Sequence, residues 1–259
     1  MNDIATHRQQ VAAPAVATPT VDLFGVDLAC LTLEESAQRV RQLVASGGPH
    51  QHVVLNAAKV VAMEDDPQLR AIVRSCALVN ADGTSIVWAS RLLGRRLPER
   101  VAGIDLFDRL VAVAAADGHS IFLLGATDDV VKTTASVLEQ RYPDVKIAGF
   151  RSGFWTDDDE VIAEVRAANP TYLFLAIPSP RKEYWLHEHL AHLGVPFVMG
   201  VGGSFDVVAG VTKRAPRAMQ RAGLEWFWRF IQEPRRMWRR YLVGNARFIR
   251  LTIREKRRA

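Results

Sequence analysis

Short apolar runs alternate with amphipathic stretches along most of the chain. The apolar runs are rich in β-branched or aromatic residues and predict strands at residues 52–55, 77–79, 120–124, 145–148, 172–177 and 196–199. The clearest amphipathic stretches predict helices over residues 104–116, 128–141, 157–168 and 181–193. This alternation predicts an α/β fold with a mostly parallel, Rossmann-like sheet that helices cover on both faces.

The start of the chain departs from this alternation. Residues 1–20 are rich in Ala, Thr, Pro and Gln without periodicity, and we expect a disordered segment there. Residues 21–29 alternate like two short strands with Gly25 at the bend. Thr32 and Glu35 have the spacing of a capping box, which predicts a helix that begins there and ends near Gly47.

Charge is distributed unevenly along the 259 residues, whose formal net charge is +5. Residues 210–259 contain fifteen basic residues (Lys and Arg) and three acidic residues (Asp and Glu). Residues 1–209 contain eighteen basic and twenty-five acidic residues. An acidic body with a strongly basic end is typical of proteins with a polyanionic partner. We therefore expect an α/β domain over 21–209 and a basic, aromatic helical appendage over 210–259.

Several classes of protein are excluded by simple features of the sequence. Cys30 and Cys76 are the only cysteines, which argues against a disulfide scaffold or a cysteine-built zinc site. No apolar run approaches the roughly 20 residues of a membrane-spanning helix. The N-terminus lacks the basic start and apolar stretch of a signal peptide, so we expect a cytoplasmic protein.

Candidate ligand-binding residues follow four of the predicted strands, because ligands of open parallel sheets bind beyond the carboxyl ends of the strands. These residues are Asn56, Asp82, Gly125 and the pair Gly202-Gly203. The glycines suit a phosphate-bearing ligand, since they let the backbone approach it closely. Asp82, in Ala-Asp-Gly, is interpreted either as part of an ordinary turn, the commoner case, or as a general base.

Three other motifs have structural explanations that we prefer. The segment that begins at Gly125 reads G-A-T-D-D-V and lacks the later glycines of a dinucleotide fingerprint. The acidic run 157–160 resembles a Mg²⁺ motif, but with Thr156 as N-cap it is more typical of a helix start. His187, His189 and His192 lack metal-ligand spacing and are interpreted as packed or solvated.

Aromatic and basic residues are interleaved in the appendage. Arg229, Arg236 and Arg239 would lie on one face of a helix if Pro234 permits it to continue. Such a segment is a surface helix packed by its aromatic residues, a membrane-surface helix, or a binding site for single-stranded nucleic acid. We favour the anionic membrane surface, because the apolar content is high for a nucleic-acid face.

Several segments together resemble the WecG/TagA/CpsF glycosyltransferases, glycosyltransferase family 26. They are VVLNAAKVV, LVNADGTSIVWASRLLG, LPERVAGIDL, IFLLGATDDV, RYPDVKIAGFRSGF, PSPRKEYW, GVGGSFDVVAG and KRAPRAMQRAGLEWFWRFIQEPRRMWRRYL. They follow in the same order over roughly residues 21–250, which is far more specific than any single motif.

The resemblance implies a metal-independent, inverting enzyme without a cofactor. It would move a sugar from a UDP-sugar to a polyprenyl-diphosphate-linked acceptor at the inner face of the bacterial membrane, in surface polysaccharide or exopolysaccharide synthesis. It identifies Asp82 as the base. The family's Thr-x-Asn corresponds to Val54-Leu55-Asn56, and its Pro-x-Gln-Glu corresponds to residues 180–183, with Lys182 for Gln before Glu183. The implied donors are UDP-glucose, a UDP-uronic acid or UDP-N-acetylmannosamine.

Further roles follow from the same resemblance. The family's C-terminal arginines correspond to Arg229, Arg236 and Arg239, which would contact the lipid diphosphate and the membrane. Arg100 and Asp105 are candidates for donor binding or, equally, for a buried ion pair. A homo-oligomer is possible. The alternatives are a nicotinamide-dependent oxidoreductase and a module that binds nucleic acid through residues 210–259.

Overall fold

The computed structural model describes residues 18–232 and 234–258, and for residues 221, 229 and 234–243 it describes the backbone alone. The strands are β1 (Thr20–Leu23), β2 (Val26–Ala29), β3 (His50–Leu55), β4 (Leu78–Ala81), β5 (Ser120–Gly125), β6 (Lys146–Arg151), β7 (Tyr172–Ala176) and β8 (Phe197–Gly200). The helices are α1 (Leu33–Ala45), α2 (Ala57–Asp65), α3 (Pro67–Ser75), α4 (Thr84–Leu92), α5 (Gly103–Asp117), α6 (Asp128–Arg141), α7 (Asp158–Ala168), α8 (Arg181–Leu193), α9 (Ser204–Val208), α10 (Arg217–Arg221), α11 (Glu225–Gln232) and α12 (Pro234–Lys256).

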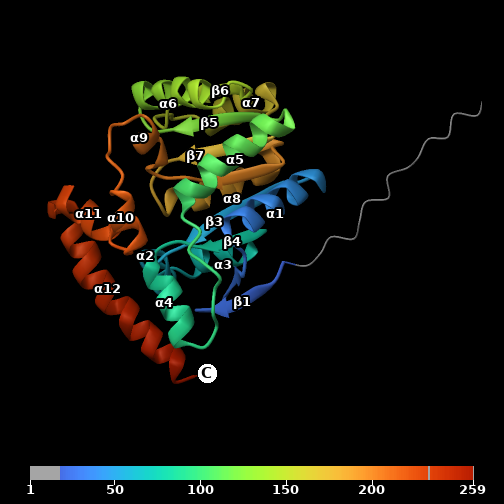
Figure 1. Cartoon of the computed structure of the whole chain (residues 1–259). Helices are drawn as coiled ribbons and strands as arrows, with labels where there is room; N and C mark the ends of the chain where they lie inside the picture. Colours follow the sequence, from blue (N-terminus) through green and yellow to red (C-terminus); the bar gives the residue numbers. More distant parts are fainter. Residues whose placement is uncertain (1–17, 233, 259) are drawn as a thin grey trace, which may run out of the picture.

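Six parallel strands form the central sheet, in the order β4-β3-β8-β7-β5-β6 (Figure 1). The antiparallel hairpin β1-β2 lies next to the edge strand β4. The predicted α/β fold with a mostly parallel sheet is therefore confirmed. Its strands are nearly continuous apolar runs because both faces of a parallel sheet are covered.

Three apolar clusters fill the space between the sheet and its helices. One face packs on α1, α5, α6 and α9 through residues such as Val40, Phe107 and Phe205. The opposite face packs on α2, α3 and α4 around β3 and β4. It also packs on α7 and α8 around β5 and β7. Successive strand residues point to opposite faces, so neighbours such as Leu123 and Leu124 enter different clusters.

Local sequence signals explain where several helices begin. Thr32 and Glu35 form the predicted capping box of α1, in which the Thr32 side chain accepts from the Glu35 amide. The expected disordered segment 1–20 falls mostly outside the described residues, although Thr20 already belongs to β1. The predicted N-cap of α7 is wrong by one residue. Asp157, not Thr156, caps the helix by accepting from the amides of Asp159 and Glu160 at 2.9 and 3.3 Å.

The acidic run at the start of α7 has a structural role, as predicted. Asp158 accepts hydrogen bonds of 2.6 Å from the indole N–H groups of both Trp155 and Trp185. Burial of the Asp158 carboxyl raises its pKa, but the hydrogen bonds from the two indoles lower it, and the pKa lies below the ordinary value. His189 packs against Trp185 with ring centroids 5.0 Å apart, which agrees with the interpretation of this histidine as packed.

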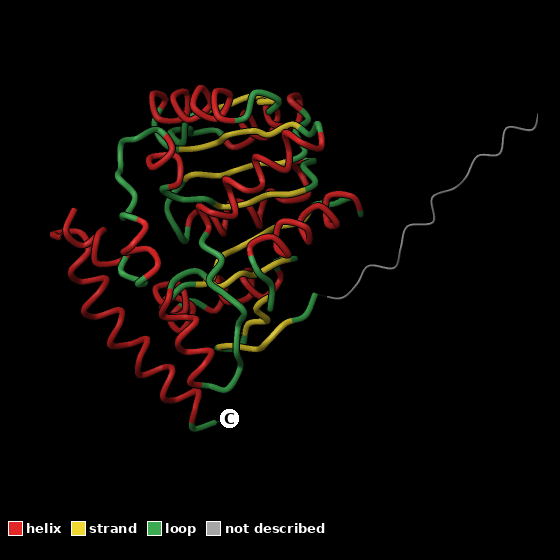
Figure 2. Tube along the Cα trace, viewed as in Figure 1, coloured by secondary structure: helices red, strands yellow, loops and turns green. Residues whose placement is uncertain are grey.

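The basic end of the chain folds back along the first half of the protein as α10, α11 and α12 (Figures 1 and 2). Arg229 belongs to α11, and Arg236 and Arg239 belong to α12. Residue 233 between the two helices lies outside the described residues, so one continuous face for the three arginines stays a prediction. Helix α12 packs on α2 and inserts Phe248 beside Phe24, with ring centroids 5.5 Å apart. Among the described residues, no helix is both long and apolar enough to cross a bilayer.

Candidate functional site

The carboxyl edge of the sheet brings several of the predicted site residues into one row. Strands β4, β3 and β8 are neighbours, and they are followed by Asp82, Asn56 and Gly202. Helix α2, after β3, packs on one face of the sheet and α9, after β8, on the other. Such a change of side between adjacent strands marks the usual ligand position in parallel α/β sheets.

Asp82 lies one residue beyond β4 and is half-buried. Its amide donates to the Leu55 carbonyl at 2.8 Å, so its backbone lies against the end of β3. Gly83 follows with a φ of +92°, a conformation that favours glycine and turns the chain into α4. Asp82 can therefore belong to a turn and also place its carboxyl group at the edge of the sheet.

Two other segments lie next to this turn. The Val101 amide donates to the Ala81 carbonyl at 2.9 Å, which brings the segment before α5 to the end of β4. The Thr84 hydroxyl donates to the Gly223 carbonyl at 3.3 Å, which brings the segment between α10 and α11 to the start of α4. The appendage is therefore in direct contact with the residues that follow Asp82.

Asn56 has a structural role at the end of β3. Its Oδ1 accepts from the Lys59 amide at 2.9 Å and caps α2. This bond satisfies one of the free amides in the first turn of α2, so the helix itself needs a residue of this kind here. The cap also fixes the start of α2, and with it the position of the Lys59 side chain.

Lys182 and Glu183 lie in a buried cluster of charges at the start of α8. Glu183 Oε1 lies 2.6 Å from Lys59 Nζ, and the Glu183 and Lys59 residues are 2% and 5% exposed. Lys182 Nζ donates to the Gly200 carbonyl at 3.3 Å and lies 3.9 Å from Glu183 Oε1. Lys59, Lys182 and Glu183 thus form one buried group of charged side chains next to the end of β8.

The glycine at the end of β8 makes room for this lysine. A Cβ atom on Gly200 would come within 2.8 Å of Lys182 Cδ, so the lysine stem runs directly over that residue. Gly202 has a φ of +55°, and a Cβ there would lie 3.5 Å from Lys182 Nζ. Gly203 has an ordinary backbone conformation and precedes α9. The glycines at this strand end therefore accommodate the Lys182 side chain.

Gly125 is separated from Asp82 along the sheet edge. Strand β5 is four positions from β4, which corresponds to about 19 Å. A Cβ on Gly125 would lie 2.5 Å from the Ala176 carbonyl oxygen, so glycine is required by the close approach of β7. The structure therefore does not bring Gly125 together with Asp82, Asn56 and Lys182.

A chain of buried hydrogen bonds lies on the other face of β3. His52 Nε2 and Asn80 Oδ1 are 3.0 Å apart, and Asn80 Nδ2 donates to Ser36 Oγ at 2.9 Å. Burial lowers the pKa of His52 to about 3. The hydrogen bond to Asn80 raises this pKa, whereas the positive charges of Lys59 and Lys182 lower it further. His52 is therefore neutral and unsuited to supply charge.

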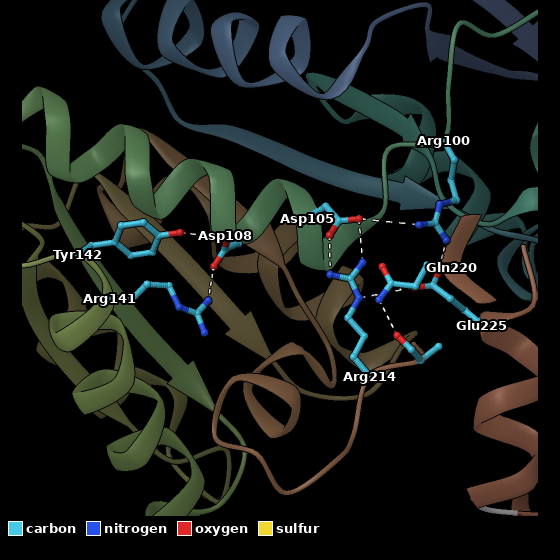
Figure 3. Close-up of polar contacts among 9 residues, drawn as sticks. Arg100, Asp105, Asp108, Arg141, Tyr142, Arg214, Gln220 and Glu225 are labelled. Atoms are coloured by element: carbon cyan, nitrogen blue, oxygen red, sulfur yellow. Dashed lines mark hydrogen bonds and ion pairs between the residues drawn. The ribbon is translucent and has the colours of Figure 1, made fainter. Parts of the chain in front are cut away.

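Arg100 and Asp105 belong to a cluster of four charged residues between the α/β body and the appendage (Figure 3). Arg214 lies 2.6 Å from Asp105, Arg100 Nη2 lies 3.8 Å from Asp105, and Glu225 contacts both arginines. Arg100 and Asp105 thus form an ion pair that is only partly buried, and donor binding by the same two residues stays a prediction. The cluster also joins that pair to α11.

Sequence reasoning missed the partners in both charge clusters. Lys59 is a single lysine in the apolar stretch VVLNAAKVV, and Glu225 is one of three acidic residues in a basic segment. These exceptions to the local pattern were the available signals. The side chains of Arg229, Arg236 and Arg239 lie outside the described residues. Within 18–232 and 234–258, no three His, Cys, Asp or Glu side chains form a group that could hold a metal ion.

Comparison with known proteins gives a match over most of the chain. A model described as "Glycosyl transferase WecG/TagA/CpsF family" matches residues 21–259. An N-acetylglucosaminyldiphosphoundecaprenol N-acetyl-beta-D-mannosaminyltransferase of Bacillus subtilis (strain 168) is 40% identical over 171 residues, 66% of each chain. A protein of the same name from Staphylococcus aureus (strain MW2) is 30% identical over 224 residues, 86% of this chain and 88% of the relative.

Proposed function

The chain belongs to the WecG/TagA/CpsF family of glycosyl transferases, and we propose that it transfers a sugar from a UDP-sugar to a polyprenyl-diphosphate-linked acceptor. The curated relatives are named as N-acetyl-beta-D-mannosaminyltransferases, so the expected hexosyltransferase class is confirmed. The observation that carries the proposal is the position of Asp82. Its carboxyl follows β4 at the sheet edge, next to the strand end that precedes Asn56.

Asp82 is the proposed general base. An acceptor hydroxyl attacks the anomeric carbon of the donor, and the Asp82 carboxylate takes the hydroxyl proton. A new C–O bond forms while the bond between the anomeric carbon and the diphosphate oxygen breaks, and UDP leaves with that electron pair. Because attack occurs opposite the leaving group, a single displacement inverts the anomeric centre.

Lys182 is the proposed partner of the leaving diphosphate, which gains negative charge as the bond breaks. Its ammonium group lies at the end of β8, one strand beyond Asn56, and the buried pair of Lys59 and Glu183 supports its position. Asn56, Gly202 and Gly203 line the same edge and complete the proposed donor site. Arg229, Arg236 and Arg239 are proposed to neutralise the acceptor diphosphate, and no metal ion takes part.

The donor is proposed to be UDP-glucose, a UDP-uronic acid or UDP-N-acetylmannosamine. The relatives' names specify N-acetylmannosaminyl transfer to N-acetylglucosaminyl-diphosphoundecaprenol. Val54 and Lys182 stand where the family pattern has Thr and Gln, and a few side chains decide which sugar a pocket accepts. These two substitutions support a donor panel wider than the relatives' own sugar.

We also propose that the protein acts as a peripheral enzyme on the inner face of the cell membrane, where a polyprenyl-linked acceptor resides. The basic appendage beside the site supports this location. The family match does not support a nicotinamide-dependent oxidoreductase, and the sequence lacks the glycine fingerprint of that class. The nucleic-acid module likewise has no support from the comparisons.

A UDP-release assay tests the proposal. The full chain is given each of the three UDP-sugars, EDTA, and a polyprenyl-diphosphate-linked N-acetylglucosamine acceptor in vesicles. We expect acceptor-dependent UDP release from one donor and a loss of about 10²–10⁴-fold in Asp82→Asn, because the base is removed. Full turnover by Asp82→Asn would remove Asp82 from the mechanism. Failure of UDP to bind in calorimetry would contradict the proposed donor class.

A further inference from the structure

Helix α4 has two large apolar side chains on its solvent side. Trp88 is 65% exposed and Leu92 is 50% exposed, and their spacing of four residues places them on one side of the helix. Ile86 and Ala89 on the opposite side pack into the apolar core, so the packing of α4 does not depend on Trp88 and Leu92. Tryptophan side chains are highly buried on average, so the exposure of Trp88 requires an explanation.

Helix α12 carries a second pair of the same kind. Ile249 is 57% exposed and Ile253 is 46% exposed, again four residues apart. Phe248 and Leu251 of the same helix enter the core cluster that also contains Ile86 and Ala89 of α4. The two helices are therefore anchored in one core cluster. Each presents an apolar pair to the solvent.

Positive charge accompanies both pairs. Among the exposed basic residues on or next to these helix segments are Arg91, Arg96, Arg250, Lys256, Arg257 and Arg258. Arg247 and Arg254 of α12 are exposed as well, but they pair with Asp65 and Glu64 of α2. Glu255, the acidic residue at this end of α12, lies 3.4 Å from Arg95 and is thus neutralised locally. Exposed aromatic and aliphatic side chains flanked by arginine and lysine match the interface of an anionic bilayer, with its apolar interior and negative surface.

We propose that the solvent sides of α4 and α12, with Trp88, Leu92, Ile249 and Ile253, form the surface that inserts into an anionic membrane. This inference rests on the proposed function and adds α4 to the membrane contact. Trp88 is four residues beyond Thr84, where α4 begins, and the helix rises about 6 Å over that length. Asp82 lies only two residues before α4, so insertion of Trp88 would bring Asp82 near the lipid surface, where the acceptor diphosphate lies.

Vesicle flotation of the full chain tests this surface. The double variant Trp88→Gln/Leu92→Gln is compared with the wild type on phosphatidylcholine vesicles, with and without phosphatidylglycerol, over a salt series. Phe150→Ser is the matched control, because this aromatic residue is 44% exposed on β6 at the other edge of the sheet. We expect the double variant to lose about tenfold or more in partition to anionic vesicles, and the control to match the wild type.

Two further measurements make the outcome decisive. Ile249→Gln/Ile253→Gln is expected to weaken flotation in the same way, and it replaces the α4 variant if thermal unfolding shows that variant to be misfolded. Flotation of both double variants equal to wild type would overturn the proposal. So would a wild-type dimer that Trp88→Gln/Leu92→Gln dissociates without loss of vesicle binding, since the surface would then be an interface between copies.

Turnover separates this proposal from the proposed function. On a water-soluble, short-chain acceptor the α4 variant is expected to match the wild type, whereas on vesicle-embedded acceptor it is expected to fall with its vesicle binding. Absence of turnover by the wild type on both acceptors counts against the proposed function, while flotation still decides the membrane surface. Equal turnover of variant and wild type on embedded acceptor counts against the membrane surface alone.

Discussion

Lys59 Nζ lies 2.6 Å from Glu183 Oε1, which joins α2 to α8 across 124 residues of sequence. Both side chains are almost fully buried, and Glu183 Oε2 has no hydrogen-bond partner within the described parts of the chain. Burial makes each charge costly without the other. The pair therefore fixes the start of α8, and with it Lys182, only as long as both members are present.

Removal of one member is expected to be far more harmful than removal of both. Glu183→Gln and Lys59→Met each leave one buried charge uncompensated, and each should lower the free energy of unfolding by about 3–5 kcal/mol. Lys59→Met/Glu183→Met should lose less than the sum of the two. Urea unfolding measures all three. Single-variant losses below about 1 kcal/mol would show that solvent reaches the pair.

The cluster at the appendage is expected to hold α11 in place. Glu225→Gln removes the carboxylate that contacts Arg100 and Arg214, so we expect a loss of about 1–2 kcal/mol and faster hydrogen exchange in α11. Arg141→Gln is the control, because its 2.6 Å pair with Asp108 is much more exposed (Figure 3). Equal exchange in wild type and Glu225→Gln would argue against the role of this cluster.

His52 is expected to make the protein acid-sensitive. Its pKa is about 3 in the folded protein and about 6.5 in the unfolded chain, so between these values the unfolded chain binds the additional proton. The contribution of His52 is complete above pH 6.5 and falls by about 1.4 kcal/mol per pH unit below it.

Denaturant unfolding at a series of pH values measures this effect. Carboxyl groups titrate in the same range, so the informative quantity is the difference between wild type and His52→Gln. Gln retains an N–H donor for Asn80 but does not titrate. We expect the wild type to lose stability relative to His52→Gln as the pH falls from 6.5. A pH-independent difference would contradict a neutral His52.

Lys182 is expected to contribute to UDP affinity. Lys182→Gln, which restores the family's residue, removes a positive charge next to the end of β8 and should weaken UDP binding by about tenfold. Calorimetry measures the dissociation constant, and Lys132→Gln on the exposed side of α6 controls for net charge. An unchanged constant in Lys182→Gln would place the diphosphate elsewhere.

The elements of the fold could be predicted because their signals are local. The apolar runs that form β5 and β7, and the capping box at Thr32, depend on neighbouring residues only. The errors occurred where two residues offer equivalent chemistry. Thr156 and Asp157 are both good N-caps, and the choice between them depends on the path of the preceding loop.

The site could be predicted only in part, because strand ends are visible in a sequence but strand order is not. Asp82 and Asn56 are neighbours since β4 pairs with β3, whereas Gly125 lies four strands from β4. Lys59, which pairs with Glu183, and Glu225, which pairs with Arg100, are each more than 100 residues away from their partners in sequence. Such contacts depend on the assembled fold and leave only weak traces in the local pattern.

The packing of α12 against α2 also has a consequence for biosynthesis. Phe248 and Leu251 complete an apolar cluster whose other members lie mostly between residues 23 and 97. On the ribosome, residues 23–97 keep an open apolar surface until Phe248 and Leu251 have also emerged. The core is therefore completed when the basic helix α12 emerges, so a nascent chain gains this positively charged helix and its fully packed core at the same stage of synthesis.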